Sequence, residues 1–112
     1  MTDRIFVGTE LKFKIDIEAA GFSMADDNFT VDIVRGDKVQ HFEKTDLIQD
    51  EKDFYVCFDS AYFGPGIVRA VIYAYVPDND FGDGLRTEVY QLDLIRIENV
   101  LVRRTPYGLI EG

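Results

Sequence analysis

One cysteine, one histidine and a cluster of aspartates are the side chains best suited to chemistry in this sequence. Cys57 and His41 are the only residues of their types, so a nucleophilic dyad would have to join these two. A reactive thiolate needs a lowered pKa and a third group that orients its base, and neither neighbourhood supplies one. We expect Cys57 to be buried in a strand and His41 to lie exposed on an edge strand. The sequence therefore predicts a protein that is not an enzyme.

The counts also exclude two structural devices. A single cysteine cannot form an intrachain disulfide, and one cysteine with one histidine cannot supply a tetrahedral zinc site. Residues 78–84 form the other candidate metal site, because Asp78, Asp80 and Asp83 offer carboxylates to a calcium ion. The spacing departs from the EF-hand pattern, whose closing glutamate would fall on Val89. We predict no metal and no cofactor, and we interpret the Asp and Gly residues as turn formers.

Size and charge limit the class of protein and of partner. The 112 residues suit one domain, and 46% hydrophobic with 29% charged residues is ordinary globular composition. The net charge of −9 disfavours nucleic acid and anionic membranes as partners. Residues 1–8 lack the apolar region of a secretory signal. We expect the protein to stay in the cytoplasm after synthesis and to leave it only within a larger assembly, a virion.

Apolar and polar residues alternate along much of the sequence, which indicates that the candidate side chains are positioned on strands. It predicts strands over residues 10–19, 29–33, 39–42, 54–58, 67–76 and 86–98, with a hairpin turn at residues 35–38 and a turn at residues 62–66. The apolar parity slips by one residue in the last strand, which predicts a β-bulge near residues 93–95. Residues 23–27 could make one helical turn.

These elements predict an all-β fold. About seven short strands with turn signals about every 8–12 residues are typical of an immunoglobulin-like antiparallel β-sandwich, here over residues 1–98. Its predicted core includes Phe13, Ile15, Ile17, Val31 and Ile33. Residues 99–112 then remain as a C-terminal strand or interaction arm, which we call the C-terminal arm.

Two segments carry a family resemblance. Residues 62–70, with a Gly-Pro-Gly turn, and residues 76–89, which spell VPDNDFGDGLRTEV, form the pattern, and residues 7–12 match its usual start. The chain resembles the small Ig-like β-sandwich proteins encoded among phage and prophage structural genes of Bacteroidetes. It is more loosely similar to the N-terminal domains of phage baseplate upper proteins. The resemblance implies a tail- or baseplate-associated structural protein whose partners are other virion proteins or a second copy.

The motif also has a physical interpretation. Arg86, held near Asp78, Asp80 or Asp83, would fix the loop by bidentate hydrogen bonds, with Glu88 projecting from the same strand face. This arrangement, the loop latch, and an interface remain equal alternatives for the motif.

Tyrosines and the C-terminal arm are the predicted contact residues. Tyr73, Tyr75 and Tyr90 lie on strands with two apolar-leaning faces. The arm is apolar although it lies beyond the last predicted strand of the sandwich, and it carries the only two adjacent arginines in the sequence. Its candidate contacts are Val100, Val102, Arg103, Arg104 and Tyr107. We expect it to add as a strand to another subunit, and the alternative is a strap on its own domain.

A binding module is the alternative function. Aromatic residues near the 78–84 loop could hold a carbohydrate or another cell-surface ligand, with calcium assisting. A thermal midpoint that rises with calcium would favour this alternative.

Overall fold

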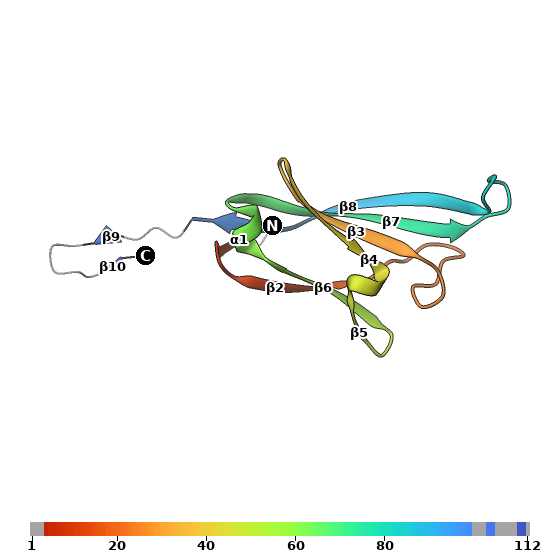
Figure 1. Ribbon diagram of the computed structural model, residues 1–112, viewed down its shortest axis with the longest axis horizontal. Coiled ribbons are helices and arrows are strands. Elements are labelled where there is room, and N and C mark those ends of the chain that lie inside the picture. The colour runs from red at the N-terminus through yellow and green to blue at the C-terminus, as the bar shows by residue number, and fades with distance from the viewer. Residues whose placement is uncertain (1–3, 100–102, 105–109, 112) are drawn as a thin grey trace.

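The computed structural model describes residues 4–99 and the backbone of residues 103–104 and 110–111. Its two packed sheets confirm the predicted all-β sandwich (Figure 1). The larger sheet contains β1 (Arg4–Phe6), β3 (Phe29–Arg35), β4 (Lys38–Glu43), β7 (Gly66–Pro77) and β8 (Leu85–Glu98); the smaller contains β2 (Glu10–Ile15), β5 (Ile48–Asp50) and β6 (Asp53–Asp59). Two short helices, η1 (Lys44–Asp46) and α1 (Ser60–Phe63), connect strands.

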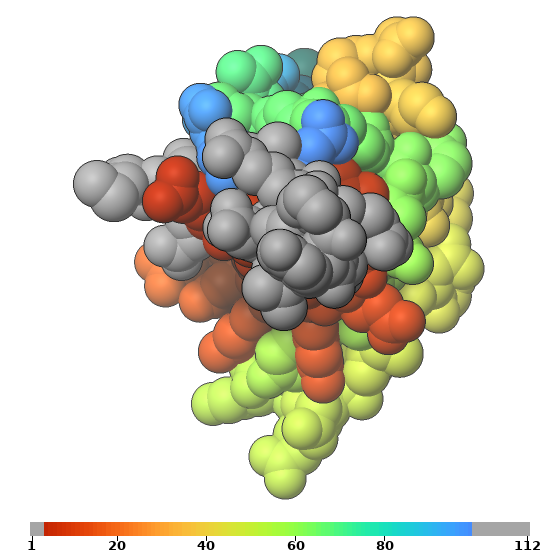
Figure 2. Space-filling view, turned by 90° about the vertical axis from the view of Figure 1, so that its left-hand side faces the viewer, coloured from red at the N-terminus to blue at the C-terminus, as the bar shows by residue number. Residues whose placement is uncertain are grey.

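The strand order is that of an immunoglobulin-like sandwich. The larger sheet runs β1-β8-β7-β3-β4 and the smaller runs β2-β6-β5. In immunoglobulin domains, strands B and E share one sheet, and strands C, F and G share the other. Here β2 and β6 take the places of B and E in the smaller sheet. β3, β7 and β8 take the places of C, F and G in the larger sheet. Viewed from one end, the β3–β4 turn and the β5–β6 turn project from opposite sides of the molecule (Figure 2).

One strand pair departs from the antiparallel prediction. β1 lies parallel to the end of β8, with Ile5 opposite Ile97. After β1 the chain crosses to the smaller sheet at Gly8, whose φ of +100° favours glycine. Because β2 to β7 lie between β1 and β8 in the chain, no hairpin joins the two, and a long connection permits parallel pairing.

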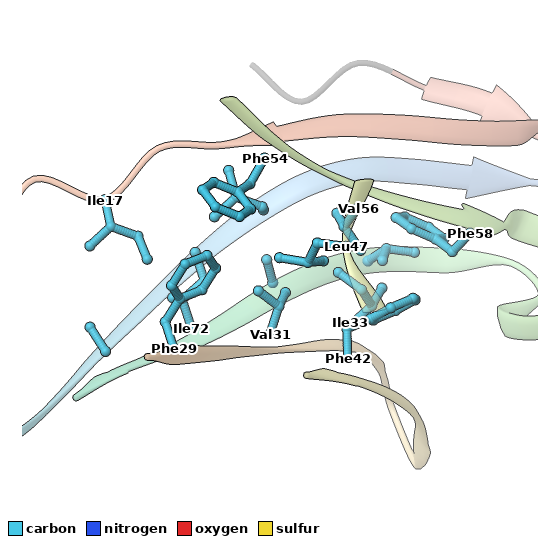
Figure 3. Close-up of a cluster of buried hydrophobic side chains, with 14 of the residues drawn as sticks. Ile17, Phe29, Val31, Ile33, Phe42, Leu47, Phe54, Val56, Phe58 and Ile72 are labelled. Carbon is cyan, nitrogen blue, oxygen red and sulfur yellow. The ribbon is translucent and has the colours of Figure 1, made fainter. Parts of the chain in front are cut away.

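The core lies between the two sheets. Side chains from both sheets meet there, including Phe29 and Val31 from β3 and Phe54 and Val56 from β6 (Figure 3). Of the predicted core residues, four are confirmed as buried: Ile15, Ile17, Val31 and Ile33. Phe13 is only partly buried, because it stacks on Phe58 at the margin of the core, 5.8 Å between ring centroids.

β6 shows why the prediction for Cys57 was wrong. Phe54, Val56 and Phe58 point into the core, so Cys57, which lies between two of them, must point outward. Its side chain is exposed.

The long β7–β8 hairpin confirms the predicted bulge. Val68 pairs with Ile95 and the next residue, Arg69, pairs with Asp93, which leaves Leu94 as the extra residue. β7 is central in its sheet, between β8 and β3, and its even-numbered residues from Val68 to Val76 are buried.

Turn chemistry explains the Gly-Pro-Gly segment. The predicted turn begins instead as the helical turn α1, in which the Asp59 side chain accepts a hydrogen bond from the amide of Ala61, 2.8 Å. Gly66 then passes so close to Arg35 that a Cβ would lie 2.7 Å from its Cδ. Arg35 in turn donates from Nε to the carbonyl of Phe63, 2.7 Å. The segment thus packs the β6–β7 connection onto the end of β3.

One other predicted element differs and one agrees. The strand predicted over residues 10–19 ends at Ile15, because its partner β6 begins just beyond the facing residue Phe54. Residues 23–27 form the single helical turn predicted there, in which the amide of Asp27 donates to the carbonyl of Ser23, four residues earlier, across 2.8 Å. In the described residues no helix is long and apolar enough to span a membrane.

The described part of the C-terminal arm forms a third, separate sheet. β9 (Arg103–Arg104) and β10 (Ile110–Glu111) pair antiparallel with each other. Among the described strands, neither pairs with the sandwich, and Figure 1 shows them beyond its end, past α1.

Candidate interface

The inner face of β8 carries a row of partly exposed side chains in the segment before the bulge. Tyr90 lies opposite the buried Ile72, so it faces the interior side of the sheet. Strand alternation places Arg86, Glu88 and Leu92 on the same side. The smaller sheet covers β8 only near Ile95 and Ile97, which are buried, whereas Leu92 is 46% exposed.

Three of these residues form one hydrogen-bonded chain with the loop. Arg86 donates from one terminal nitrogen to a carboxylate oxygen of Asp78. Its other terminal nitrogen donates to Oε2 of Glu88, 2.9 Å, and the hydroxyl of Tyr90 donates to Oε1 of the same residue, 2.8 Å. The loop-latch residues Arg86, Asp78 and Glu88 are therefore in contact.

The other two aspartates of the loop do not reach Arg86. The amide of Asp80 donates to Oδ1 of Asp78, 3.0 Å, and Oδ1 of Asp83 accepts from the amide of Leu85, 3.1 Å. These are turn-forming contacts. Within residues 4–99, no three histidine, cysteine or acidic side chains gather as a metal site.

Electrostatics favour the charged forms of Asp78, Arg86 and Glu88. The amide of Asp80 and the guanidinium of Arg86 lower the pKa of Asp78. Arg86, and then the Tyr90 hydroxyl, lower the pKa of Glu88. Glu88 raises the pKa of Tyr90, because its carboxylate favours the protonated phenol. At neutral pH this series of hydrogen-bonded side chains therefore contains two carboxylates, one guanidinium and one neutral hydroxyl.

A groove runs beside this row. Its volume is about 280 Å³, and we call it the β8 groove. Its lining comprises Asp16, Ile17 and Glu18, which follow β2, together with Ile72, Tyr90, Gln91 and Leu92. Tyr90 belongs both to the latch and to the groove, so the latch orders one wall of the groove.

The backbone edge of β8 next to the groove is open. In the described residues, β1 pairs only with positions 96–98 of β8, and no strand pairs with the outer edge of residues 85–93. The amide of Asp78 donates to the carbonyl of Gly84, 2.9 Å, so these two form a hydrogen-bonded pair. Along an antiparallel ladder such pairs alternate with non-hydrogen-bonded pairs, whose amides and carbonyls point away from the partner strand.

Counting from Gly84 identifies the outward-pointing groups. The amides and carbonyls of Thr87, Val89 and Gln91 point to the open edge. An independent contact supports the count: Tyr75, which faces Thr87, donates its amide to the carbonyl of Asn28 on the opposite side, 3.0 Å.

The three predicted contact tyrosines do not share a surface. Tyr73 and Tyr75 alternate with the buried residues of β7, so they lie on the outer face of the larger sheet, while Tyr90 lies on the inner side. On the same outer face, the ring of His41 lies between Oδ1 of Asp32, 2.5 Å, and Oε1 of Glu43, 3.4 Å. The hydrogen bond that the His41 ring makes to the Asp32 carboxylate is the main cause of a raised pKa for His41.

Cys57 and His41 cannot act as a dyad. Cys57 faces outward from the smaller sheet and His41 faces outward from the larger one, so the core separates them. Of the arm candidates, Val100, Val102 and Tyr107 lie outside the described residues. Arg103 and Arg104 are described only as backbone in β9.

Sequence reasoning missed the groove residues Ile17 and Leu92 as a site. Ile17 was assigned to the core, which it does reach, and Leu92 was not singled out. The slip in apolar parity was the available signal: before the bulge, Leu92 takes the same parity as Tyr90, Glu88 and Arg86.

Comparison with known proteins adds a remote likeness. No family model and no curated protein matches the chain. Among solved structures, the chain is similar to a "putative glycoside hydrolase" from Bacteroides vulgatus, with a TM-score of 0.48 and 14% sequence identity. The match covers 91% of this chain and 19% of that one.

Proposed function

We propose that this chain is a non-enzymatic assembly protein, an Ig-like domain that joins a phage or prophage tail or baseplate by strand addition. The observation that carries the proposal is the open outer edge of residues 85–93 of β8 beside a groove with both apolar and acidic residues in its lining. The assignment to a virion rests on the motif resemblance. Its expected partners are other virion proteins or a second copy.

The contrast between two edges supports an assembly role. Proteins usually protect exposed strand edges with charge, proline, short length or a cover. The edge of β4 is protected: Tyr62 donates its hydroxyl to the outward carbonyl of Val39, 3.2 Å, and the Asp46 carboxylate accepts the amide of Glu43, 2.9 Å. The open stretch of β8 presents the uncharged residues Thr87, Val89 and Gln91 instead.

Particle association tests the proposal. Prophage induction in a strain that encodes the chain should place it in purified particles, at a fixed ratio to the major tail protein through two successive density gradients. Deleting the gene should give particles that lack a complete tail or baseplate in electron micrographs. If the chain remains at the top of the gradient and its deletion leaves intact particles, the virion role is wrong.

The carbohydrate-binding alternative has one supporting observation. Phe81, in the loop between β7 and β8, is 47% exposed and can stack on a sugar. A glycan array probed with and without millimolar calcium tests it, with Phe81→Ala as the matched variant. Glycan binding that this substitution abolishes would favour the alternative.

A further inference from the structure

We propose that the β8 groove and the open edge of β8 accept residues 99–104 of a second copy's C-terminal arm as an added strand. The inference rests on the proposed assembly function and names its donor and its acceptor. The partner is a second copy of this chain.

The backbone of the acceptor is ready for pairing. Thr87, Val89 and Gln91 each direct an amide and a carbonyl outward, which is the pattern that a neighbouring strand requires. Strand addition to a sheet edge gains its affinity from such main-chain hydrogen bonds, and side-chain pockets add specificity.

The β8 groove supplies the side-chain pocket. Ile17 and Leu92 give it apolar surface, and the ring of Tyr90 is held by its hydrogen bond to Glu88. Asp16 and Glu18 add two carboxylates to the lining. A matching strand therefore carries apolar side chains on one face and basic side chains next to them.

The C-terminal arm has this composition. Residues 99–104 read Asn-Val-Leu-Val-Arg-Arg, so Val100 and Val102 share one face of an extended strand, and two arginines follow. Pro106 lacks the amide that a continuing ladder needs, which limits the added strand to the residues before it. The length suits an ordinary strand.

Charge favours the same pairing. Residues 1–98 contain 20 acidic and 10 basic residues, whereas the arm contains two arginines and one glutamate. A basic arm is therefore attracted to an acidic body, and this attraction speeds association at low salt. The aliphatic residues of the arm then gain by leaving water.

The topology favours a second copy over the arm's own domain. β8 leads directly into the arm, and β1 already occupies the edge at positions 96–98. The arm would have to double back across β1 to reach the open edge of its own strand. Its described strands β9 and β10 lie instead beyond that end of the sandwich (Figure 1).

A proline substitution tests the acceptor in the full chain. Val89→Pro removes an outward amide and leaves the hydrogen bonds between β7 and β8 in place. Val39→Pro is the matched control, because Val39 is exposed to a similar degree, 48% against 51%, and its backbone also points to an outer edge. Light scattering coupled to size exclusion should show association of the wild type and of Val39→Pro. Val89→Pro should weaken it about tenfold or more.

A mixing experiment tests donor and acceptor together. The arm variant Val100→Asp/Val102→Asp retains an open edge, and Val89→Pro retains an intact arm. Each alone should be monomeric, and a mixture should form a one-to-one dimer and stop there. Far-UV circular dichroism and thermal midpoints confirm that all variants fold.

The outcomes separate the two proposals. A wild-type chain that stays monomeric at millimolar concentration overturns the second copy as partner, whatever the particle experiment shows. Association that Val89→Pro and Val39→Pro leave equally intact overturns the β8 edge as acceptor and retains self-assembly. A one-to-one dimer from the mixture, combined with absence from particles, supports the inference and refutes only the virion role.

Discussion

The hydroxyl of Tyr90 donates to Oε1 of Glu88, two residues earlier on the same face of β8, across 2.8 Å. This bond joins the loop latch to the wall of the β8 groove. It makes the ring position of Tyr90 dependent on residues that lie nearer the loop, and it yields the first of four predictions.

Tyr90→Phe should separate the hydrogen bond from the ring. The phenylalanine keeps the packing against the core and loses a solvent-screened hydrogen bond, so we expect only a small loss in the free energy of unfolding. Tyr90→Ala should cost clearly more, because it also removes the ring. Urea unfolding measures both. Equal losses for the two variants would contradict the packing role of the ring.

Acid should destabilise the protein partly through the latch. The pKa values of Asp78 and Glu88 are lowered in the folded state, so their stabilisation is present above the ordinary carboxyl range and is lost as pH falls through the folded values. We expect the thermal midpoint of unfolding to decrease when the pH is lowered below about 4. Arg86→Met, which keeps an apolar stem, should flatten this fall between pH 5 and the acid limit. A profile of unchanged steepness would show that the latch contributes nothing to acid sensitivity.

Gly66→Ala should destabilise the sandwich by about 1–3 kcal/mol. Gly66 has a φ of +134°, and a Cβ there would lie 2.7 Å from Cδ of Arg35. Gly82→Ala is the control, because a Cβ at Gly82 meets nothing within 4 Å. It should leave the urea midpoint unchanged or raise it slightly. Similar effects of both substitutions would contradict the close approach of Gly66 to Arg35.

Cys57 should react in the folded protein. Its thiol is exposed on the outer face of β6, so a thiol reagent such as dithionitrobenzoate should modify it fully without denaturant. The rate should match that of the urea-unfolded chain within about tenfold, since no opening of the core is required. Modification that needs denaturant would place the thiol inside.

Strands with clear alternation were predictable because burial acts on every second residue. β6 is an example, since Phe54, Val56 and Phe58 identify its inner face without further knowledge. The bulge at Leu94 was also predictable, because the one-residue slip in apolar parity is visible in the sequence.

Other features depend on contacts that the sequence does not display. β1 has three residues and pairs with positions more than ninety residues later, which no local pattern indicates. The helical turn α1 depends on a single capping contact from Asp59. The face of Tyr90 depends on the register of β8 against β7, so its separation from Tyr73 and Tyr75 required the pairing of Tyr90 with Ile72.

The extra residue at Leu94 divides β8 into two segments whose inward positions are out of phase. Before the bulge the even-numbered residues point inward, and after it Ile95 and Ile97 do. Deleting Leu94 would bring the segments into phase. With Ile95 and Ile97 kept in the core, regular alternation would still point Arg86, Glu88, Tyr90 and Leu92 inward, as they point now. A β8 that kept Leu94 but formed no bulge would instead turn Thr87, Val89 and Gln91 toward the groove. The bulge, as well as the composition of β8, therefore determines which set of side chains meets a partner.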